Sequence, residues 1–573
     1  MKNEKTPMRL PYIYTLKFII VVTLISGCNN EQTVNKQISQ QITQVTPVSE
    51  TEGTVKSYAP AKSWLEANQV YNKEAPIPPQ CYTKTEQVKN PCYVCHQSYH
   101  DQKLRPNKLN DGFQQGSYAF SDIGVSNSWR NLFVDRTRKI TKISDKQILD
   151  YINQDNYSPF IEKLKNSDWK SIIPEIENLH LGAEAFDEHG LAKDGSGWVA
   201  FNYKPMPSTF WPTNGSTDDV MIRLPDEFMQ INGEYSRDAY YANLALVEMA
   251  IADTQETTTI PINEKAIKAD LNGNGLLEEK VQRIKRSSHY LADASTLQLA
   301  HMLYPEGTAF LHTVRYVNVD DSGAVDTSPR MKEVRYMVKK KFLSLGELKG
   351  RYYLERKEKH FESLPYYNTF GDDGVSNKHG WTLLGFIENE QGELRKQNDE
   401  EQFFCTGCHK SVGSIIDKTF SFPRKVAGVN GWGYINLKSM SDVPNIGEDK
   451  GEILTYLERV GGGDEFRQNQ EMITRWFNRD GSVNKKKVLS QKNIYDLITP
   501  SRRRALDMNK AYKTIVEEQS FIYGRDATLV KAENVLSKVN ETQAPLHKEH
   551  IHKWDIRLDW SKGEKVTVAK TEK

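Results

Sequence analysis

The chain has 573 residues, a length that suggests about three domains. Its 76 Lys and Arg residues balance 75 Asp and Glu residues, which leaves a formal net charge of +1. This balance excludes the strongly basic surface that nucleic-acid binding requires, so we expect no nucleic-acid partner. The sequence also contains no Gly-rich phosphate loop, nucleophile elbow or zinc-protease helix motif.

The first 27 residues have the pattern of a secretion signal. Basic residues precede a short apolar run at 18–25, which is followed by Ser26, Gly27 and Cys28. The run is far shorter than the roughly 18–20 residues that span a bilayer. Residues 25–28, Ile-Ser-Gly-Cys, resemble a bacterial lipobox, which implies cleavage before Cys28 and a lipid anchor on that cysteine. Asn29 then suggests sorting to the outer membrane, and an ordinary signal peptide with an incidental cysteine is the alternative.

Residues 28–57 are predicted to be a flexible tether. They are rich in Gln, Asn, Thr, Ser and Val and contain almost no aromatic residues. Such a segment cannot bury enough apolar surface to fold. As a flexible coil it would reach on the order of 30 Å from the lipid to the folded body.

Residues 92–96, Cys-Tyr-Val-Cys-His, concentrate three metal-binding side chains in five positions. A Cys-x-x-Cys-His sequence attaches a c-type haem: the two sulfurs bond to the porphyrin edge, and the histidine binds the iron. On a helix the three side chains share one face. Cys92 and Cys95 could instead be zinc ligands or a redox-active disulfide, although the disulfide needs no histidine.

Several helices and strands are predicted farther along the chain. Ser144 and Gln147 form a capping box for a helix through Ile152. Ser236 is expected to cap a helix that continues through Ile251. Residues 309–319 and 333–342 are rich in β-branched and aromatic residues and predict a long hairpin, and residues 381–387 predict another strand. Thr499 and Pro500 indicate the start of a helix that runs to about Gln519.

Residues 270–278, Asp-Leu-Asn-Gly-Asn-Gly-Leu-Leu-Glu, resemble the first part of an EF-hand calcium loop. The resemblance implies calcium ligands at Asp270, Asn272, Asn274, the carbonyl of Leu276, and Glu278. Helices are expected at 263–269 and 278–287. Position 12 of the loop is Val281, where a bidentate Glu is expected, so weak affinity follows. An Asn-Gly turn without calcium is the alternative.

Residues 405–409, Cys-Thr-Gly-Cys-His, repeat the first motif. Two chance matches in one chain with six cysteines are far rarer than one. All four motif cysteines could converge on one zinc ion, but zinc leaves the histidine after each pair unexplained. Through these two motifs alone, the chain resembles c-type cytochromes. The resemblance implies two covalent haems on Cys92, Cys95, Cys405 and Cys408, iron ligation by His96 and His409, and attachment outside the cytoplasm.

The sixth ligand of each iron is not determined by the motifs. Met206 and Met440 are loop methionines of a suitable kind, and His180 and His189 are further candidates. His100 follows His96 by one turn and would point from the same helix face. Cys81 has no cysteine left for an intramolecular disulfide and is expected to be a buried free thiol. A cluster of three histidines near the C-terminus, which could cap a haem or lie on a solvated segment, comprises His547, His550 and His552.

These signals predict an α+β protein with helical haem-binding regions flanking a mixed middle domain. The expected divisions are a signal peptide at 1–27, a tether at 28–57, a first haem region at 58–180, a middle domain at 181–395, a second haem region at 396–480, and a helical C-terminal region with a charged tail at 481–573.

Three functions are consistent with these features. The first is electron transfer between redox partner proteins by a lipid-anchored dihaem cytochrome at the cell envelope. The second is a dihaem oxidoreductase, similar to a peroxidase, with one five-coordinate haem. The third is a metal-stabilised binding protein without haem. We favour electron transfer, because the motifs supply redox cofactors but do not specify an open iron.

Overall fold

The computed structural model of the chain has a long antiparallel hairpin at its centre. Its strands are β7 (Ala309–Val319) and β8 (Val325–Lys339), and this confirms the predicted hairpin. β8 begins earlier than predicted and includes Pro329. The pairing register shifts between Arg315 and Val317, opposite this proline. Because a proline has no N–H to donate, it is tolerated at such an irregularity.

The structure describes residues 76–100, 105–106, 110–208, 211–360, 368–410, 412–540 and 546–562. The predicted signal peptide, the lipidation site Cys28 and the tether lie outside these residues. The described residues belong to one compact unit, and the finer division into haem regions and a middle domain stays a prediction. Within this part of the chain, no helix is both long and apolar enough to cross a membrane.

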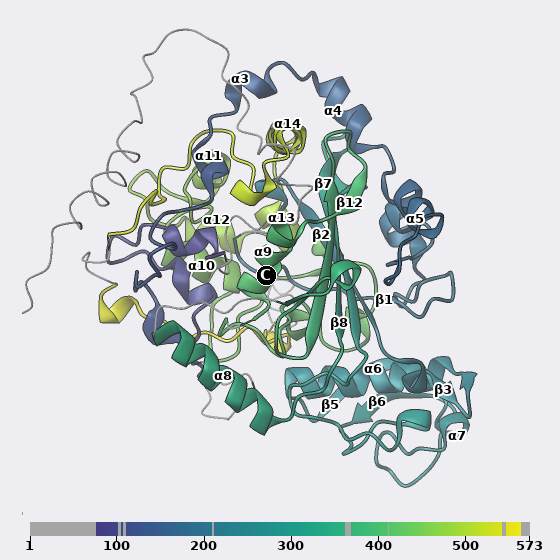
Figure 1. Cartoon of the computed structure of the whole chain (residues 1–573). Coiled ribbons are helices and arrows are strands. Elements are labelled where there is room, and N and C mark those ends of the chain that lie inside the picture. The colour runs from purple at the N-terminus through teal and green to yellow at the C-terminus, as the bar shows by residue number, and fades with distance from the viewer. Residues whose placement is uncertain are drawn as a thin grey trace, which may run out of the picture. The chain divides into compact units, whose positions relative to one another are not determined.

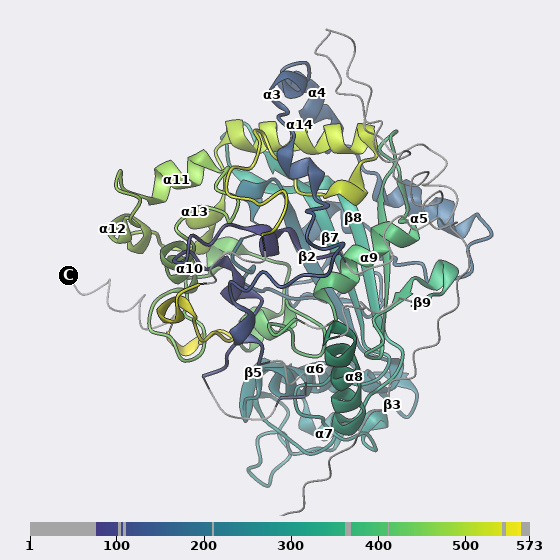
Figure 2. The same ribbon diagram turned by 60° about the vertical axis from the view of Figure 1, so that its left-hand side comes forward.

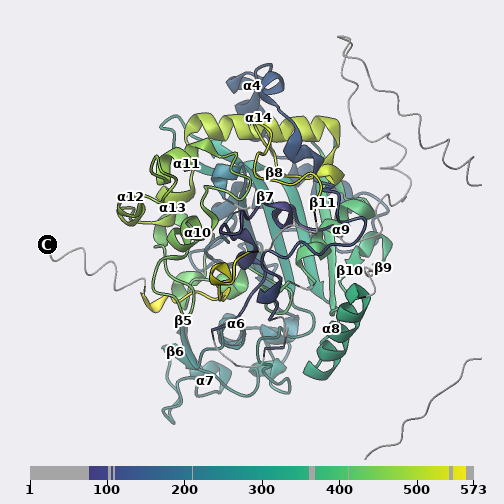
Figure 3. The same cartoon turned by 90° about the vertical axis from the view of Figure 1, so that its left-hand side faces the viewer.

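The hairpin is the middle of an eight-stranded antiparallel sheet, seen face-on in Figure 3. The strand order is β1, β2, β7, β8, β11, β10 and β9, and β12 pairs with β11. The remaining strands are β1 (Val199–Ala200), β2 (Thr217–Arg223), β9 (Asn368–Thr369), β10 (Val375–Ser376), β11 (Trp381–Glu388) and β12 (Leu394–Lys396). β11 confirms the strand predicted at 381–387.

The alternation of side chains along the strands gives the sheet two buried faces. On β2 and β7, Val220 and Phe310 belong to one hydrophobic cluster, whereas Met221 and Leu311 belong to another. The second cluster includes Phe160 of α5 (Tyr157–Lys165), which packs on this side of the sheet. The first face is directed toward both Cys-x-x-Cys-His segments. The sheet is therefore a wall between the candidate site and a separate hydrophobic core.

Helices and two short strand pairs surround the sheet (Figures 1 and 2). α14 (Arg502–Glu518) packs along the end of the sheet that contains part of β7, and α6 (Arg237–Ala252) packs on β5 (Glu256–Ile262), which pairs with β6 (Val281–Lys285). The second short pair is β3 (Gln230–Ile231) with β4 (Glu234–Tyr235). The other α-helices are α3 (Thr137–Ile140), α4 (Asp145–Ile152), α7 (Glu264–Ile267), α8 (Leu345–His360), α9 (Asp399–Cys408), α10 (Glu452–Val460), α11 (Gln470–Trp476), α12 (Lys485–Leu489) and α13 (Ile494–Ile498).

The predicted helix starts were mostly correct. Ser144 and Gln147 form the full capping box of α4, and the Ser236 hydroxyl accepts from Ala239 N–H at the start of α6. α14 is present as predicted, but its cap is Ser501 rather than Thr499. The mixed α+β class is confirmed. The segment around the first motif, however, consists mainly of 3₁₀ turns and irregular chain, and its motif lies on the 3₁₀ turn Pro91–Val94 rather than on an α-helix.

A buried ion cluster joins distant parts of the sequence beside the sheet. Glu452 on α10 is 1% exposed and contacts Lys204 and Arg424, whose Nη2 lies 2.6 Å from Glu452 Oε2. Burial alone would raise the pKa of Glu452, but the two cations outweigh burial and lower this pKa to about 2. The carboxylate is therefore charged. Its ion pair with Lys204 joins segments that are more than two hundred residues apart in the chain.

We predict that Glu452→Gln lowers the free energy of unfolding by about 3–5 kcal/mol, because it leaves buried Arg424 without its counter-charge and Lys204 with Asp442 alone. Urea unfolding at pH 7 measures this change. The surface variant Asp150→Asn, which removes the exposed pair with Lys146, should change the unfolding free energy by less than about 0.5 kcal/mol. The difference in unfolding free energy between the wild type and Glu452→Gln should shrink as the pH falls from 4.5 toward 2. In this range the Glu452 carboxylate becomes protonated and loses its attraction to the two cations. Equal stability of the two variants would contradict this assignment.

Candidate functional site

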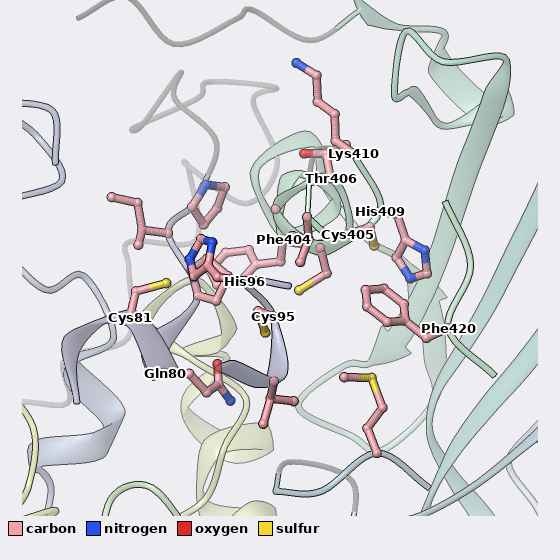
Figure 4. Close-up of a pocket in the computed structure, with 18 of the residues that line it drawn as sticks. Gln80, Cys81, Cys95, His96, Phe404, Cys405, Thr406, His409, Lys410 and Phe420 are labelled. Carbon is pink, nitrogen blue, oxygen red and sulfur yellow. The ribbon is translucent and has the colours of Figure 1, made fainter. Parts of the chain in front are cut away.

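Both Cys-x-x-Cys-His motifs line one cavity with a volume of about 970 Å³. Figure 4 shows side chains of the two motifs directed into this shared space. The motifs are 313 positions apart in the sequence, measured from Cys92 to Cys405. The motif residues that line the cavity are Cys92, Cys95, His96, Cys405, Cys408 and His409. The fold thus brings together the six residues that the sequence singled out.

The first motif is formed by a single tight turn. Asn90 Oδ1 accepts from Tyr93 N–H at the start of this turn, and Pro91 occupies its first position. The backbone N–H of His96 then donates to Cys92 O at 2.8 Å. Asn90 Nδ2 donates to Gln115 Oε1 at 2.8 Å, which ties the turn to the following loop. One turn is sufficient to direct both cysteines and the histidine toward the cavity.

The second motif lies at the C-terminal end of α9. Asn398 and Glu401 form a capping box at the start of this helix, and Arg395 makes two hydrogen bonds to Glu401 at 2.8 and 2.9 Å. His409 is the C-terminal cap residue, and its N–H donates to Cys405 O at 2.9 Å. The helix is therefore fixed at its start, and its last turn presents the motif.

Each motif histidine is oriented by a hydrogen bond at Nδ1. His96 Nδ1 lies 3.0 Å from Asp111 Oδ2, and His409 Nδ1 lies 2.6 Å from the carbonyl oxygen of Lys418. A carboxylate and a carbonyl only accept hydrogen bonds, so Nδ1 carries the proton in both rings. The Nε2 atoms then keep the lone pair that a metal requires. Burial also lowers the pKa of His409 to about 4, which keeps this ring neutral.

A tight turn presents the Lys418 carbonyl to His409. Ile416 and Thr419 exchange backbone hydrogen bonds of 3.1 Å, and both Asp417 and Lys418 have positive φ angles of 46° and 70°. Two positive φ angles define a type I′ turn, in which Gly or Asn is normally preferred. Asp417 Oδ2 accepts from Lys339 Nζ at 2.5 Å and stabilises the strained conformation. Asp417 is a common turn residue, but the sequence contained little signal for this turn, because Lys418 rather than Gly follows it.

The buried Lys418 amine holds the same turn from the other side. Its Nζ donates to the Tyr352 hydroxyl of α8 and to the carbonyl oxygen of Lys410, at 2.5 Å from the latter. Burial lowers the pKa of Lys418 to about 7. The positioning of His409 therefore depends on α8 and β8 as well as on its own helix.

The motif cysteines are half-buried, protonated thiols. Burial raises the pKa of Cys92 and of Cys408 to about 11 in each case. All five cysteines of the described residues are free of disulfides, whereas a zinc site requires thiolates. Within the ranges that the structure describes, no three or more His, Cys, Asp or Glu side chains are arranged to hold a metal ion. The four cysteines face a shared cavity without gathering around one point.

The cavity wall combines apolar surface with a charged end. Toward the sheet it is lined by Val220, Phe310, Met337 and Leu383, and its remaining aromatic lining includes Tyr118, Phe120, Trp129, Phe404 and Phe420. This lining suits a large flat apolar group. At one end, Arg335 and Arg525 share the carboxylate of Glu333, with distances of 3.0 and 2.7 Å. Arg525 Nε has no hydrogen-bond partner among the described residues. Asp526 also lies beside the two guanidiniums, and this unpartnered Nε of Arg525 is a donor for a carboxylate of a ligand.

His312 also lines the cavity, although it was not among the site residues predicted from the sequence. It lies on β7 between Val220 and Arg335 in one row across the sheet. His312 Nε2 lies 3.5 Å from Asp218 Oδ2, and this carboxylate also accepts from the Tyr203 hydroxyl. The available signal was a lone histidine in a strand that is otherwise largely apolar.

The candidate sixth ligands occupy different places. Met206 and Cys81 line the cavity together with the motifs. Met440 is 2% exposed and packs in the main hydrophobic cluster. His180 Nδ1 lies 3.4 Å from Asp155 and His189 Nε2 lies 3.7 Å from Glu188, so both rings have partners away from the motifs. His96 and His409 themselves also line the cavity. His100, in contrast, packs against Gly447. Of the C-terminal histidines, His552 packs edge-on against Tyr93, next to Cys92.

The loop at 270–278 does bring its polar side chains together. Asp270 accepts from the backbone N–H groups of Gly273 and Gly275 at 2.7 Å each, and Asn272 and Asn274 both donate to Glu278 Oε2 at 2.8 Å. The carboxylates thus bind groups of the loop itself. The expected helix at 278–287 is wrong, because residues 281–285 form β6 and pair with β5. Calcium binding by Asp270, Asn272, Asn274, Leu276 and Glu278 stays a prediction.

Comparison with known proteins places the chain among lipoproteins. Residues 65–496 match the model of a lipoprotein family. An uncharacterized lipoprotein of Aquifex aeolicus (strain VF5) is 30% identical over 525 residues, which cover 81% of this chain and 88% of that protein. No solved structure matches the chain.

We predict that Asp111→Asn releases the ring of His96. Asp111 accepts from Gln97 N–H through one oxygen and from His96 Nδ1 through the other, and an amide has only one acceptor oxygen. The proton should then move to Nε2 in part of the molecules, and affinity for iron at this ring should fall by roughly 10–100-fold. Nitrogen-15 NMR of histidine-labelled protein measures the tautomer. Asp480→Asn, at a surface turn, is the control, and an unchanged His96 tautomer in Asp111→Asn would contradict the assignment.

Proposed function

This chain belongs to the lipoprotein family, and from that premise we propose that it is an envelope-anchored dihaem c-type cytochrome that acts in electron transfer. The proposal is carried by the convergence of the two motifs on one cavity, with Nδ1 of each histidine held by an acceptor. A disulfide does not involve the histidines, and among the described residues the four motif cysteines are not gathered around one point, as a single zinc site would require. A haem requires the observed orientation of the histidine at both motifs, since each iron needs the lone pair of Nε2.

Each part of the site has a role in holding haem c. Cys92 and Cys95 would form the thioether bonds to one porphyrin, and Cys405 and Cys408 the bonds to the other. A bound haem supplies an iron that alternates between the ferric and ferrous states. The aromatic lining would exclude water from the porphyrin faces, and Arg335 and Arg525 are placed to pair with propionate groups. Met206, on the cavity wall, is the candidate sixth ligand that fits electron transfer best.

Membership of a lipoprotein family fits attachment to the cell envelope through a lipid. We propose Cys28 as the lipidated residue, with residues 28–57 as the tether, and Asn29 as the residue that favours the outer membrane. The redox partners would then be other envelope proteins. Such an anchor confines the cytochrome to the compartment in which covalent haem attachment and its partners are expected.

The exported wild-type protein should carry two covalent haems, visible in its optical spectrum and as two added haem masses. The double variants Cys92→Ser/Cys95→Ser and Cys405→Ser/Cys408→Ser should each retain one, because each motif attaches its own porphyrin. Cys81→Ser, which alters a cavity thiol outside the motifs, should retain both. A colourless wild-type protein whose mass lacks both haems would overturn the proposed function.

A dihaem oxidoreductase is the second candidate, and it is favoured by the polar group of Tyr203, Asp218 and His312 in the cavity wall. A histidine linked to a carboxylate can supply a proton to a small molecule bound at an open iron. Carbon monoxide separates the two functions, because it binds a ferrous haem that has an open position. We expect no carbon monoxide complex in the wild-type protein and a complex in Met206→Ala. Formation of the complex in the wild-type protein would favour the oxidoreductase.

A further inference from the structure

Two carboxyl groups connect the main cavity with a much smaller one. Glu465 and Asp526 line both the 970 Å³ cavity and a second cavity of about 20 Å³. A cavity needs roughly 10–15 Å³ to hold a water molecule, so the smaller one has room for one. Its remaining polar lining comprises Asn214, Asp464, Gln468 and Thr528. The small cavity is therefore polar and lies directly behind the carboxyl groups.

An unpartnered buried amide points to a water in this small cavity. Gln468 is 7% exposed, and its Nε2 donates to Asp464 Oδ2 at 3.3 Å. Its Oε1 has no hydrogen-bond partner among the described residues. A buried acceptor without a partner costs free energy, and a water in the cavity would donate to it. The same water would also lie next to the carboxyl groups that line this small cavity.

Glu465 is one of the buried carboxyl groups of the fold that have no ion pair among the described residues. It is 2% exposed, and its side chain accepts from the Ser208 hydroxyl. No ion pair joins it to a cation within the described part of the chain, in contrast to Glu452 or Glu333. Burial raises the pKa of Glu465 to about 8 and that of Asp526 to about 6. Both groups can therefore change their protonation near neutral pH when the charge beside them changes.

The charged and titratable groups around the pair come from several elements. Glu465 and the adjacent Asp464 face Arg504 of α14, Tyr456 of α10, and Cys92 and Cys95 of the first motif. Asp526 faces Arg335, Lys332 and Glu333 of β8, and Arg525 beside it in the chain. As thioethers the two cysteines would carry no charge and would not titrate. The cations are concentrated around Asp526, which leaves Glu465 as the carboxyl with the least compensation.

We propose that Glu465 and Asp526, bridged by a water in the small cavity, form a proton-binding site that takes up a proton when the chain accepts an electron in the adjoining cavity. This inference rests on the proposed function. The electron comes from a redox partner protein and the proton from solvent, and both leave again when the electron passes on. Uptake of the proton keeps the net charge of the buried site constant, which matters because charges interact strongly where water is excluded.

Glu465 is the member of the pair that lies near the first motif, whereas Asp526 influences the titration of Cys408 in the second. Glu465 influences the titration of both Cys92 and Cys95, so it lies close to the edge at which a porphyrin would be attached. An added electron at this position raises the affinity of a neighbouring carboxylate for a proton. The site would thus couple proton uptake to reduction without a contact between either carboxyl and a metal ligand.

The test is redox potentiometry of the purified wild-type protein with both haems bound, between pH 5 and 9. We expect one haem to become harder to reduce as the pH rises above about 6, where Asp526 begins to ionise before reduction, and again above about 8, where Glu465 does. With one proton per electron, its reduction constant should fall up to tenfold per pH unit, equivalent to 59 mV. Glu465→Gln should flatten this dependence, and Asp526→Asn should shorten its pH window. Glu517→Gln, on the surface of α14, is the matched control and should behave as the wild type.

Infrared difference spectroscopy gives an independent readout of the same site. Reduction of the wild-type protein at pH 9, where Glu465 with a pKa of about 8 is ionised before the electron arrives, should produce the C=O band of a protonated carboxyl group, and Glu465→Gln should lack it. If Glu465→Gln does not fold, the wild-type band and the Asp526→Asn titration still decide the question. A wild-type protein with two haems, a potential independent of pH and no such band would overturn the proton site alone. Absence of haem would overturn the proposed function, and the proton site with it.

Discussion

The candidate site depends on one constraint above all: the Nδ1 atom of each motif histidine must face an acceptor. A five-residue motif supplies a histidine but does not fix which of its two ring nitrogens is protonated. Asp111 fixes the first ring and the Lys418 carbonyl fixes the second. Each acceptor lies outside its motif and is positioned by other parts of the fold. The long chain between the motifs therefore has a structural task that a minimal haem-binding peptide lacks.

The central sheet, which lies between the two motifs in sequence, positions parts of the candidate site. β7 and β8 contribute the row that contains His312 and Arg335 to one cavity wall, and their opposite face packs on α5. β8 also supplies Lys339, which holds the turn that carries Lys418. The strands that separate the motifs in sequence thus connect them in space. An insertion of this size is consistent with a scaffold for the cavity, whereas a plain tether would not require a paired sheet.

The sequence was informative wherever a local rule decides the structure. Ser144 and Ser236 were recognised as helix caps, and the residues of β7 and β8 as a hairpin, because capping and strand patterns are local. A helix was expected at 278–287, because helices flank the loop of an EF-hand, which residues 270–278 resemble. Pairing of residues 281–285 with β5 overrides this expectation. The turn at Asp417 and Lys418 could not be predicted either, because its positive φ angles are imposed by tertiary contacts rather than by glycine.

Some of the site residues were likewise predictable from local sequence, and others were not. Both motifs were identified from spacing alone, and the structure adds that they share a cavity. His312 and the acceptors Asp111 and Lys418 required three-dimensional information, because nothing in their local sequence distinguishes them from ordinary polar residues. Met206 was one of several equivalent candidates in the sequence. Its place on the cavity wall separates it from Met440, which packs in the core.

Many of the buried charges in this fold are matched by an opposite charge. Lys339 pairs with Asp417, Lys425 with Glu248, and Arg330 with Glu388, all at 2.8 Å or less. An unpaired buried carboxylate is expensive, so a carboxyl group without a cation is expected to stay protonated. Glu465 accepts from a hydroxyl and lies beside the cavity that would hold the redox centres. Buried Glu264 and Asp464 also lack an ion pair among the described residues, but Glu465 lines the main cavity, where a group that can be neutral or charged is useful because the neighbouring charge would itself change.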